Sequence, residues 1–534
     1  QYLKLVKLID IENSTNSEII KEIKRINNLY DLNIHSKSEL YDLINSISKN
    51  IILVLTDDLY DIRGLFNNKK LEAKVGKFLK DPNNKLLLND IKYKIIDKLK
   101  ESIYNEKRSL IKALNGLRVS SGPSGAPTRG KIEVLPTGRN FFSVDLRSIP
   151  TEAAWSLGRR SAQKVLDLFL LEEGNHLRKM AISVWGTATM RNGGEDIAQI
   201  LYLMGITPIW DSQNRRVIDL EIIPLSVLGR PRVDVSIRIS GLFRDAFPQI
   251  IEILNKSSII IANLEEDCYM NPLANKRKKG YSTERVFGSE PETYGTGLQE
   301  LIDFGNWEKR SDLGDKFLQW SNSIYGSNLS HRSNSSDVIE LLKGVEVVIH
   351  NQDNREHDIL DSDDYYQFHG GLSNAVEMIN DKKPNIYFSD NSNFRNPKVH
   401  KLEKEIDKVV RSRLLNPKWI EGIMGHGYKG AFEMSASLDY LYSYDATTNI
   451  VPNWCYKEIQ DKWINNNTVR TFLNKNNPWA LRDIAERLLE AANRDIWTDI
   501  SQEDRSNLRQ LILETENKIE TFNAKQSETQ DSPG

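Results

Sequence analysis

Apolar residues between 180 and 210 form two kinds of pattern, continuous runs and a helical spacing. The continuous apolar run 180–185 is typical of a buried strand. A polar loop containing Gly193 and Gly194 follows, and apolar residues then recur at helical spacing over 197–204. A further apolar run comes directly after a glycine that ends the predicted helix. The pattern therefore predicts one strand–loop–helix–strand unit.

This unit also predicts where a ligand binds. In α/β folds, ligands lie beyond the carboxyl ends of the strands, where the loops face a crevice. Thr187, Arg191 and Glu195 are therefore expected to point at a ligand. Glu195 has two interpretations, because a carboxylate in the first turn of a helix also stabilises the helix dipole. A structural role and a role as a catalytic base both remain open.

The remaining patterns predict a multidomain α/β protein. Strand and helix patterns alternate through the middle of the chain, which favours largely parallel sheet units, and helical segments lie at both ends. The predicted parts are a helical segment 1–119, an α/β domain 120–256, an α/β region 257–415, a helical region 416–523 and a disordered tail 524–534.

Composition narrows the class of protein. Lys and Arg number 72 against 74 Asp and Glu, a formal charge of −2, which argues against nucleic acid as a partner. Only two cysteines, Cys268 and Cys455, are present, which excludes a disulfide framework and favours a cytoplasmic location. No apolar run reaches the ~18 residues of a membrane span. Because Gln1 lies in an already structured-looking segment, we expect the chain to be the C-terminal part of a longer protein.

One glycine-rich stretch resembles a nucleotide site by chance. Residues 125–131 nearly match a phosphate-binding loop, but Ile132 stands where Ser or Thr should hold magnesium. A strand-like run, 132–135, follows in place of the helix that such a loop requires. ATP is therefore not expected to bind to this chain.

An acidic stretch after a predicted strand at 345–350 is the second candidate site. It contains six carboxylates between Asp353 and Asp364, with His357 and His369 nearby. Carboxylate and imidazole groups suit divalent metals, although a polar turn with capping Asp residues explains the same pattern. The spacing fits neither an EF-hand nor an HExxH site.

Five motifs in this order carry a resemblance to a known family: LPTGRNFFSVD, WGTATMRNGGEDIAQ, LGRPRVDVSIRISGLFRDAFP, NQDNREHDILDSDDYYQFHGG and NPKWIEGIMGHGYKGAFE. They resemble the large, macrocycle-binding subunits of the class I chelatases, on the cobaltochelatase side, over about 120–497. The resemblance implies ATP-dependent insertion of cobalt, as substrate, into hydrogenobyrinic acid a,c-diamide. It also implies two partners, an AAA+ ATPase subunit that uses the ATP and its associated second small subunit. No permanently bound cofactor is expected.

The same resemblance and the chemistry of insertion suggest roles for residues. A metal must lose water and the ring nitrogens must lose protons, so a base and transient ligands are needed. Glu195 is the expected base. Glu356, His357 and Asp358 are expected to pass the metal, with His426 as a further candidate. The residues expected to bind the macrocycle, its rim carboxylates or its face, are Arg139, Phe141, Trp185, Thr187, Arg191, Arg230, Arg244 and Tyr365.

Three other functions remain open. The chain could belong to a magnesium chelatase acting on protoporphyrin, or it could bind a tetrapyrrole without inserting a metal. A metal-dependent hydrolase built on the acidic stretch is the third. The interleaved histidines favour cobalt over magnesium, because Co²⁺ accepts mixed nitrogen and oxygen ligands more readily than Mg²⁺.

Overall fold

The structure is a computed structural model that describes residues 16–56, 64, 67–125, 127, 132–142, 145–327, 330–393 and 396–530. Contacts divide the chain into two compact units, 1–143 and 144–534. The glycine-rich stretch 125–131 lies mostly outside the described residues. The expected strand after it is instead a single 3₁₀ turn, Ile132–Val134.

The first unit is helical, as its sequence pattern predicts. Ile26, Leu40 and Val75 belong to its apolar core, and each is less than 2% exposed. Two short strands, β1 (Ser121–Pro123) and β2 (Asn140–Phe142), pair in parallel after the helices. The helices are α2 (Asn16–Tyr30), α3 (Lys37–Thr56), α4 (Lys69–Lys80), α5 (Pro82–Ile91) and α6 (Asp97–Leu114).

The second unit contains an eight-stranded sheet in the order β12-β11-β10-β3-β6-β7-β8-β9. Its five central strands, β11, β10, β3, β6 and β7, are parallel to one another. The mixed α/β class and the largely parallel sheet are therefore confirmed. The strands are β3 (Lys179–Val184), β6 (Asp234–Ile239), β7 (Val286–Gly288), β8 (Ser323–Tyr325), β9 (His331–Ser333), β10 (Val347–Gln352), β11 (Asn385–Asp390) and β12 (Lys398–Lys401).

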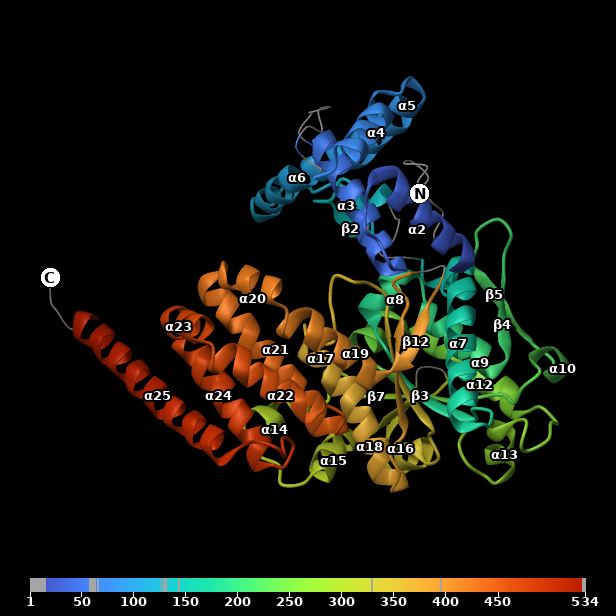
Figure 1. The fold of residues 1–534 in the computed structure, drawn as a ribbon. Helices are drawn as coiled ribbons and strands as arrows, with labels where there is room; N and C mark the ends of the chain where they lie inside the picture. The colour runs from blue at the N-terminus through green and yellow to red at the C-terminus, as the bar shows by residue number, and fades with distance from the viewer. Residues whose placement is uncertain are drawn as a thin grey trace. The chain divides into compact units, whose positions relative to one another are not determined.

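Both faces of this sheet are covered by helices, which explains why every residue of β3, β6 and β10 is buried. Successive side chains alternate between the faces, so Met180 and Ile182 enter one core while Ala181 enters the other. The first core includes α7 (Glu152–Glu173), α9 (Glu195–Met204) and α12 (Pro248–Ala262). The second includes α15 (Arg310–Trp320), α16 (Ser335–Leu342) and α18 (Gly371–Asn380) (Figure 1).

The central unit differs from its prediction in two places, although its second strand has the predicted bounds, 206–210. The stretch expected to be a loop forms a short helix, α8 (Gly186–Asn192), before the two glycines. The second predicted strand, β4 (Ile206–Trp210), does not join the parallel sheet. It pairs with β5 (Val217–Ile222) in a separate antiparallel ribbon, because the chain reverses directly after it. The parallel neighbours of β3 are instead β6 and β10.

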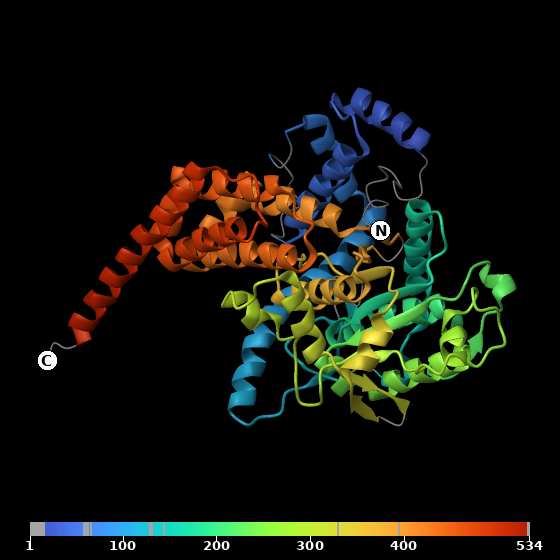
Figure 2. The same cartoon turned by 90° about the horizontal axis from the view of Figure 1, so that it is seen from below.

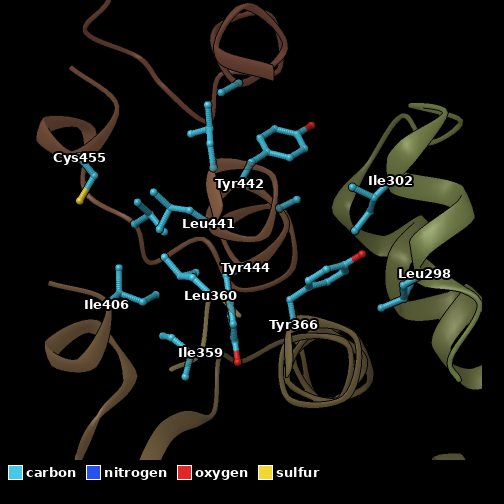
Figure 3. Close-up of a cluster of buried hydrophobic side chains, with 14 of the residues drawn as sticks. Leu298, Ile302, Ile359, Leu360, Tyr366, Ile406, Leu441, Tyr442, Tyr444 and Cys455 are labelled. Carbon is cyan, nitrogen blue, oxygen red and sulfur yellow. The ribbon is translucent and has the colours of Figure 1, made fainter. Parts of the chain in front are cut away.

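Helices make up the C-terminal part of the second unit (Figure 2). Their packing buries Leu441, Tyr442 and Cys455 together with Leu360 and Ile406 (Figure 3). The helices are α20 (Pro417–Met424), α21 (Gly427–Thr448), α22 (Asn453–Ile459), α23 (Asn467–Asn476), α24 (Pro478–Asn493) and α25 (Gln502–Gln530). The last of these continues into the segment that was expected to be disordered. Across the described residues, no helix combines the length and the apolar character needed to cross a membrane.

Shorter helices connect these elements. They are α10 (Leu225–Leu228), α11 (Gly241–Ala246), α13 (Pro272–Lys278), α14 (Leu298–Asp303), α17 (Asp363–Tyr365) and α19 (Leu402–Val409).

The close approach of α7 to α9 depends on Gly158. A Cβ at this position would lie 2.6 Å from Ala198 Cβ and 2.7 Å from both Gln199 N and Glu195 O. Two of these three atoms belong to the backbone of α9, so a side chain at position 158 could be accommodated only if the two helices moved apart.

Gly158→Ala should therefore destabilise the protein, by about 1–3 kcal/mol as is typical of overpacking. Gly422→Ala is the matched control, because no atom lies within 4 Å of the added Cβ and the position is exposed in α20. This control should be neutral or stabilising by up to ~1 kcal/mol, since Ala favours a helix more than Gly. Urea unfolding of both variants checks the difference. Equal midpoints would show that α7 and α9 adjust freely.

Candidate functional site

The order of the strands creates a crevice between β3 and β10. From β3 the chain adds β6 and β7 on one side, and later adds β10 and β11 on the other. The loops after β3 and β10 therefore leave the sheet in opposite directions. In open α/β sheets, ligands bind at such a switch point, outside the carboxyl ends of the strands.

A cavity of about 90 Å³ lies at this position. Its walls come from the residues after β3, the end of β10 and the segment that begins α17. The lining residues are Trp185, Thr187, Ala188, Arg191, His350, Asn351, Gln352, Asp353, Ser362, Asp364 and Tyr365.

Four residues predicted to bind the macrocycle lie together in this cavity: Trp185, Thr187, Arg191 and Tyr365. Trp185 and Tyr365 meet edge to face, with ring centroids 6.4 Å apart. Trp185 also packs on Phe368, at 4.4 Å between centroids. Thr187 is exposed at the mouth. These rings give the cavity an aromatic wall.

Arg191 joins the two sides of the crevice. Its Nε and Nη2 donate to both carboxylate oxygens of Asp353, at 3.0 and 2.7 Å for the shorter contacts. Asn192 donates to the same carboxylate at 3.1 Å. Asp353 is 4% exposed, so this bidentate pair is largely shielded from water. Arg191 therefore ties the loop after β3 to the end of β10.

Glu195 lies behind the cavity wall, at the first residue of α9. It is 4% exposed, and its backbone N–H donates to Asn192 Oδ1 at 3.1 Å. Gly193 and Gly194 precede it with φ of 78° and 93°, a left-handed conformation that glycine adopts without strain. A side chain at position 194 would contact Ile149 Cγ2 at 2.6 Å. Glu195 is thus held in place but does not line the cavity.

Two buried histidines flank the crevice. Both belong to the predicted acidic and histidine-containing region, but neither was assigned a role of its own. His350, at 2% exposed, lines the cavity, and its ring centroid lies 5.6 Å from that of His369, at 1% exposed. Burial lowers the pKa of His350 to about 4, although Gln352 at 3.2 Å and Asp353 oppose the shift. Burial and the neighbouring His350 lower the pKa of His369 as well. Both rings are therefore neutral at pH 7.

Asp364 provides a carboxyl group whose pKa is raised rather than lowered. Asp364 is exposed at the cavity wall, but desolvation by the surrounding protein, followed by the charge of Asp363, raises the pKa of Asp364 to about 6. A carboxyl group in this range exchanges protons near neutral pH. The sequence placed Asp364 in the acidic stretch, but spacing alone did not distinguish it from its five neighbouring carboxylates.

The residues expected to pass the metal lie elsewhere. Glu356 and His357 are exposed, and His426 is exposed at the start of α21. Asp358 accepts from Arg413 Nη1 at 2.8 Å. Within the described ranges, no group of three or more His, Cys, Asp or Glu side chains converges as a metal site would require. The structure therefore does not bring these four residues together.

Two of the arginines that were predicted to bind the macrocycle instead donate hydrogen bonds within the chain. Arg230 lies before β6, at the opposite end of the strand from the crevice, and donates to the carbonyls of Tyr202 and Leu203 at 2.7 and 3.0 Å. Arg244 donates to the carbonyl of Thr293 at 3.1 Å and to both carboxylate oxygens of Asp245. The terminal nitrogens of both side chains already donate within the chain, which argues against contact with a ligand's carboxylates.

Arg139 and Phe141 belong to the first unit. Arg139 is exposed beside β2 and lines a separate hollow with Ser109 and Gly138. The side chain of Phe141 lies outside the described residues. Their assignment to a macrocycle stays a prediction.

The fold and the crevice define a doubly wound α/β protein with a partly aromatic cavity at its switch point. A family model described as CobN/Magnesium Chelatase matches residues 4–504. The chain belongs to the CobN/magnesium chelatase family.

Relatives from both branches of the family are similar to this chain. The aerobic cobaltochelatase subunit CobN of Pseudomonas aeruginosa is 45% identical over 423 residues, covering 76% of this chain and 34% of the relative. A magnesium-chelatase subunit of Chlorobaculum parvum is 33% identical, covering 78% and 33%. The solved catalytic subunit of cobaltochelatase from Mycobacterium tuberculosis is 38% identical with a TM-score of 0.81, covering 90% and 41%. The chain thus spans about a third of the length of these curated relatives.

Acid should destabilise the protein through His350. Its pKa is about 4 when folded and near 6.5 when unfolded, so the unfolded state binds the proton first as pH falls. This group alone should remove about 2 kcal/mol of stability between pH 7 and pH 5. His350→Asn should flatten that dependence in urea unfolding, while the exposed control His331→Asn should retain it. An unchanged slope in His350→Asn would contradict the buried, neutral imidazole.

Proposed function

We propose that this chain carries the macrocycle-binding and metal-inserting site of a cobaltochelatase that acts in cobalamin biosynthesis. The substrate would be hydrogenobyrinic acid a,c-diamide, with Co²⁺ as the metal. The observation that carries the cobalt assignment is identity: two cobaltochelatase subunits are 45% and 44% identical to this chain, against 33% and 30% for magnesium-chelatase subunits.

The crevice supplies the chemistry that insertion needs. The ring nitrogens must release protons as the metal enters, so acceptors must be available at neutral pH. The proposed base is Glu195, held rigidly at the start of α9. Asp364, with its pKa of about 6, would pass protons between the cavity and solvent. The neutral imidazole of His350 offers a nitrogen ligand while the metal loses water.

The macrocycle would enter the crevice edge first. Ligand pockets commonly measure about 300–1,000 Å³, so a cavity of about 90 Å³ holds only part of a tetrapyrrole. Trp185 and Tyr365 would pack on the ring face, with Thr187 at the mouth. Arg191 would hold the crevice in shape through Asp353 and present its partly exposed guanidinium to a rim carboxylate.

Partner subunits would supply the energy for metal insertion. In this proposal an AAA+ ATPase subunit hydrolyses ATP and acts with its associated second small subunit, and the complex works in the cytoplasm. The name "subunit" for the relatives supports a multi-chain enzyme. Because the chain spans about a third of those relatives, tests of activity need the longer protein together with its partners.

Replacement of Glu195 tests the proposed base. Glu195→Gln keeps the shape of the side chain but removes the proton acceptor. In the complete enzyme it should abolish chelation, by at least the ~10²-fold typical of a lost general base, while macrocycle affinity measured by absorbance titration stays within a few-fold. Glu421→Gln, at an exposed position on α20, is the matched control and should retain full activity. Near-normal chelation by Glu195→Gln would reduce Glu195 to a helix-start residue.

The choice of metal separates the two branches of the family. Offered Co²⁺ and Mg²⁺ together with a corrin-type substrate and protoporphyrin, the complete enzyme should insert cobalt into the corrin-type ring, because an imidazole and carboxylate site favours Co²⁺ over Mg²⁺. Product absorbance spectra distinguish the metallated rings. Faster entry of magnesium into protoporphyrin would support a magnesium chelatase, and binding of either ring without insertion would support a simple tetrapyrrole-binding module.

A further inference from the structure

A second, larger cavity lies among the helices that end the second unit. It measures about 750 Å³, and α14, α21 and α24 provide most of its wall. We call it the helical groove. Its charged lining consists of five carboxylates and two guanidinium groups, a formal charge of −3: Asp303, Asp439, Asp483, Glu486, Glu490, Arg482 and Arg487.

Aromatic side chains accompany this negative charge. Tyr428 and Phe432 lie one turn apart on α21 and are 60% and 50% exposed at the groove. Tyr440 and Trp479 complete the aromatic lining. Ring faces attract organic cations, and exposed aromatic residues are enriched where proteins bind one another.

A buried hydroxyl group in the groove has no hydrogen-bond partner among the described residues. The side chain of Tyr366 is fully buried and lines the groove, yet its hydroxyl makes no hydrogen bond. Figure 3 shows this hydroxyl directed toward α14, near Ile302. Burial and then the charges of Asp439 and Asp303 raise the pKa of Tyr366. A buried hydroxyl is normally paired, so this group points to a ligand that is absent here.

The groove retains its negative charge despite its two arginines. Arg487 contacts Asp439 at 2.5 Å and Glu490 at 2.6 Å, and Arg482 contacts Asp483 at 2.8 Å. Burial still raises the pKa of Asp439 to about 6, against the opposing effect of Arg487. The carboxylates nevertheless do not converge as a metal site in the described part of the chain. An organic cation fits this groove better than a divalent metal.

We propose that the helical groove docks a basic segment of a protein partner, with an arginine or lysine side chain entering between the aromatic rings to reach Asp439 and Tyr366. The ammonium or guanidinium group would donate to both oxygens. The volume of the groove suits a side chain together with its flanking backbone, and Tyr428 and Phe432 at its edge would be covered by the partner. This inference goes beyond the proposed function and uses none of its steps.

Fluorescence anisotropy with a labelled peptide of alternating glycine and arginine tests the proposal on the 534-residue chain. The peptide should bind at low ionic strength, and a glutamate peptide of equal length should not. Tyr366→Phe removes one hydroxyl and should weaken binding about tenfold, as expected for a hydrogen bond to a charged group. Asp439→Asn should weaken it by a similar factor.

Matched controls separate specific docking from general attraction. Tyr444→Phe removes another fully buried hydroxyl that has no hydrogen bond to a described residue, on the helix that carries Asp439 but outside the groove. Asp407→Asn removes a half-exposed carboxylate elsewhere. Both should bind the peptide as the unmodified chain does. Equal affinity in all four variants would overturn the proposal. Tight binding of spermidine without peptide binding would also overturn the proposal, because it would identify a polyamine site. Displacement of the peptide by equimolar Co²⁺ would overturn it by identifying a metal site.

Discussion

The arrangement of the crevice depends on one buried amide at the end of β10. Asn351 donates to Asp196 Oδ1 at 2.7 Å and to Gln199 Oε1 at 2.5 Å, and all three residues are at most 8% exposed. Unpaired donors are costly at this depth, so α9 packs where its side chains accept from Asn351 Nδ2. This contact fixes the first turn of α9, and therefore Glu195, relative to the strand that carries His350.

A chain of side-chain hydrogen bonds continues from this amide to α7 and β11. Gln199 donates to Ser161 Oγ on α7 at 3.3 Å, and Ser161 and Ser389 share a hydrogen bond of 3.0 Å between their hydroxyls. Ser389 in turn donates to Asn391 at 2.9 Å. Helix α7 and strand β11, which lie outside the crevice, are thus tied to it. The crevice is rigid on this side, which is what a site needs when small displacements weaken catalysis.

The sequence predicted β3, β10 and α9, because continuous apolar runs and helical periods reflect burial directly. The short strands β7, β8 and β9 carry too few residues to show such a pattern. The sequence could not predict that β4 leaves the sheet, since strand pairing depends on contacts with segments that are distant in sequence. The same limit applies to the site. Trp185, Arg191 and Tyr365 were chosen from motifs and lie together. His350 was assigned no role of its own because it lies within an apolar strand pattern, where a single histidine more often has only a structural role.

The predicted metal-passing residues show a second limit. A cluster along the sequence becomes a cluster in space only if the backbone turns its side chains toward one point, and here Glu356 and His357 face solvent. Arg230 shows the converse: its sequence neighbourhood looks like a binding motif, but its guanidinium pairs with main-chain carbonyls. Only the three-dimensional structure distinguishes an available charge from one already used.

The divergence of the loops after β3 and β10 has a consequence for how such proteins change over time. Because each loop leaves the sheet on its own side, residues can be inserted or replaced in one loop without altering the register of β3 against β10. The ring or ion that such a protein accepts could therefore change through substitutions in one loop while the other loop stays the same. The shared architecture of relatives named for cobalt and for magnesium is consistent with such stepwise divergence from one ancestral crevice.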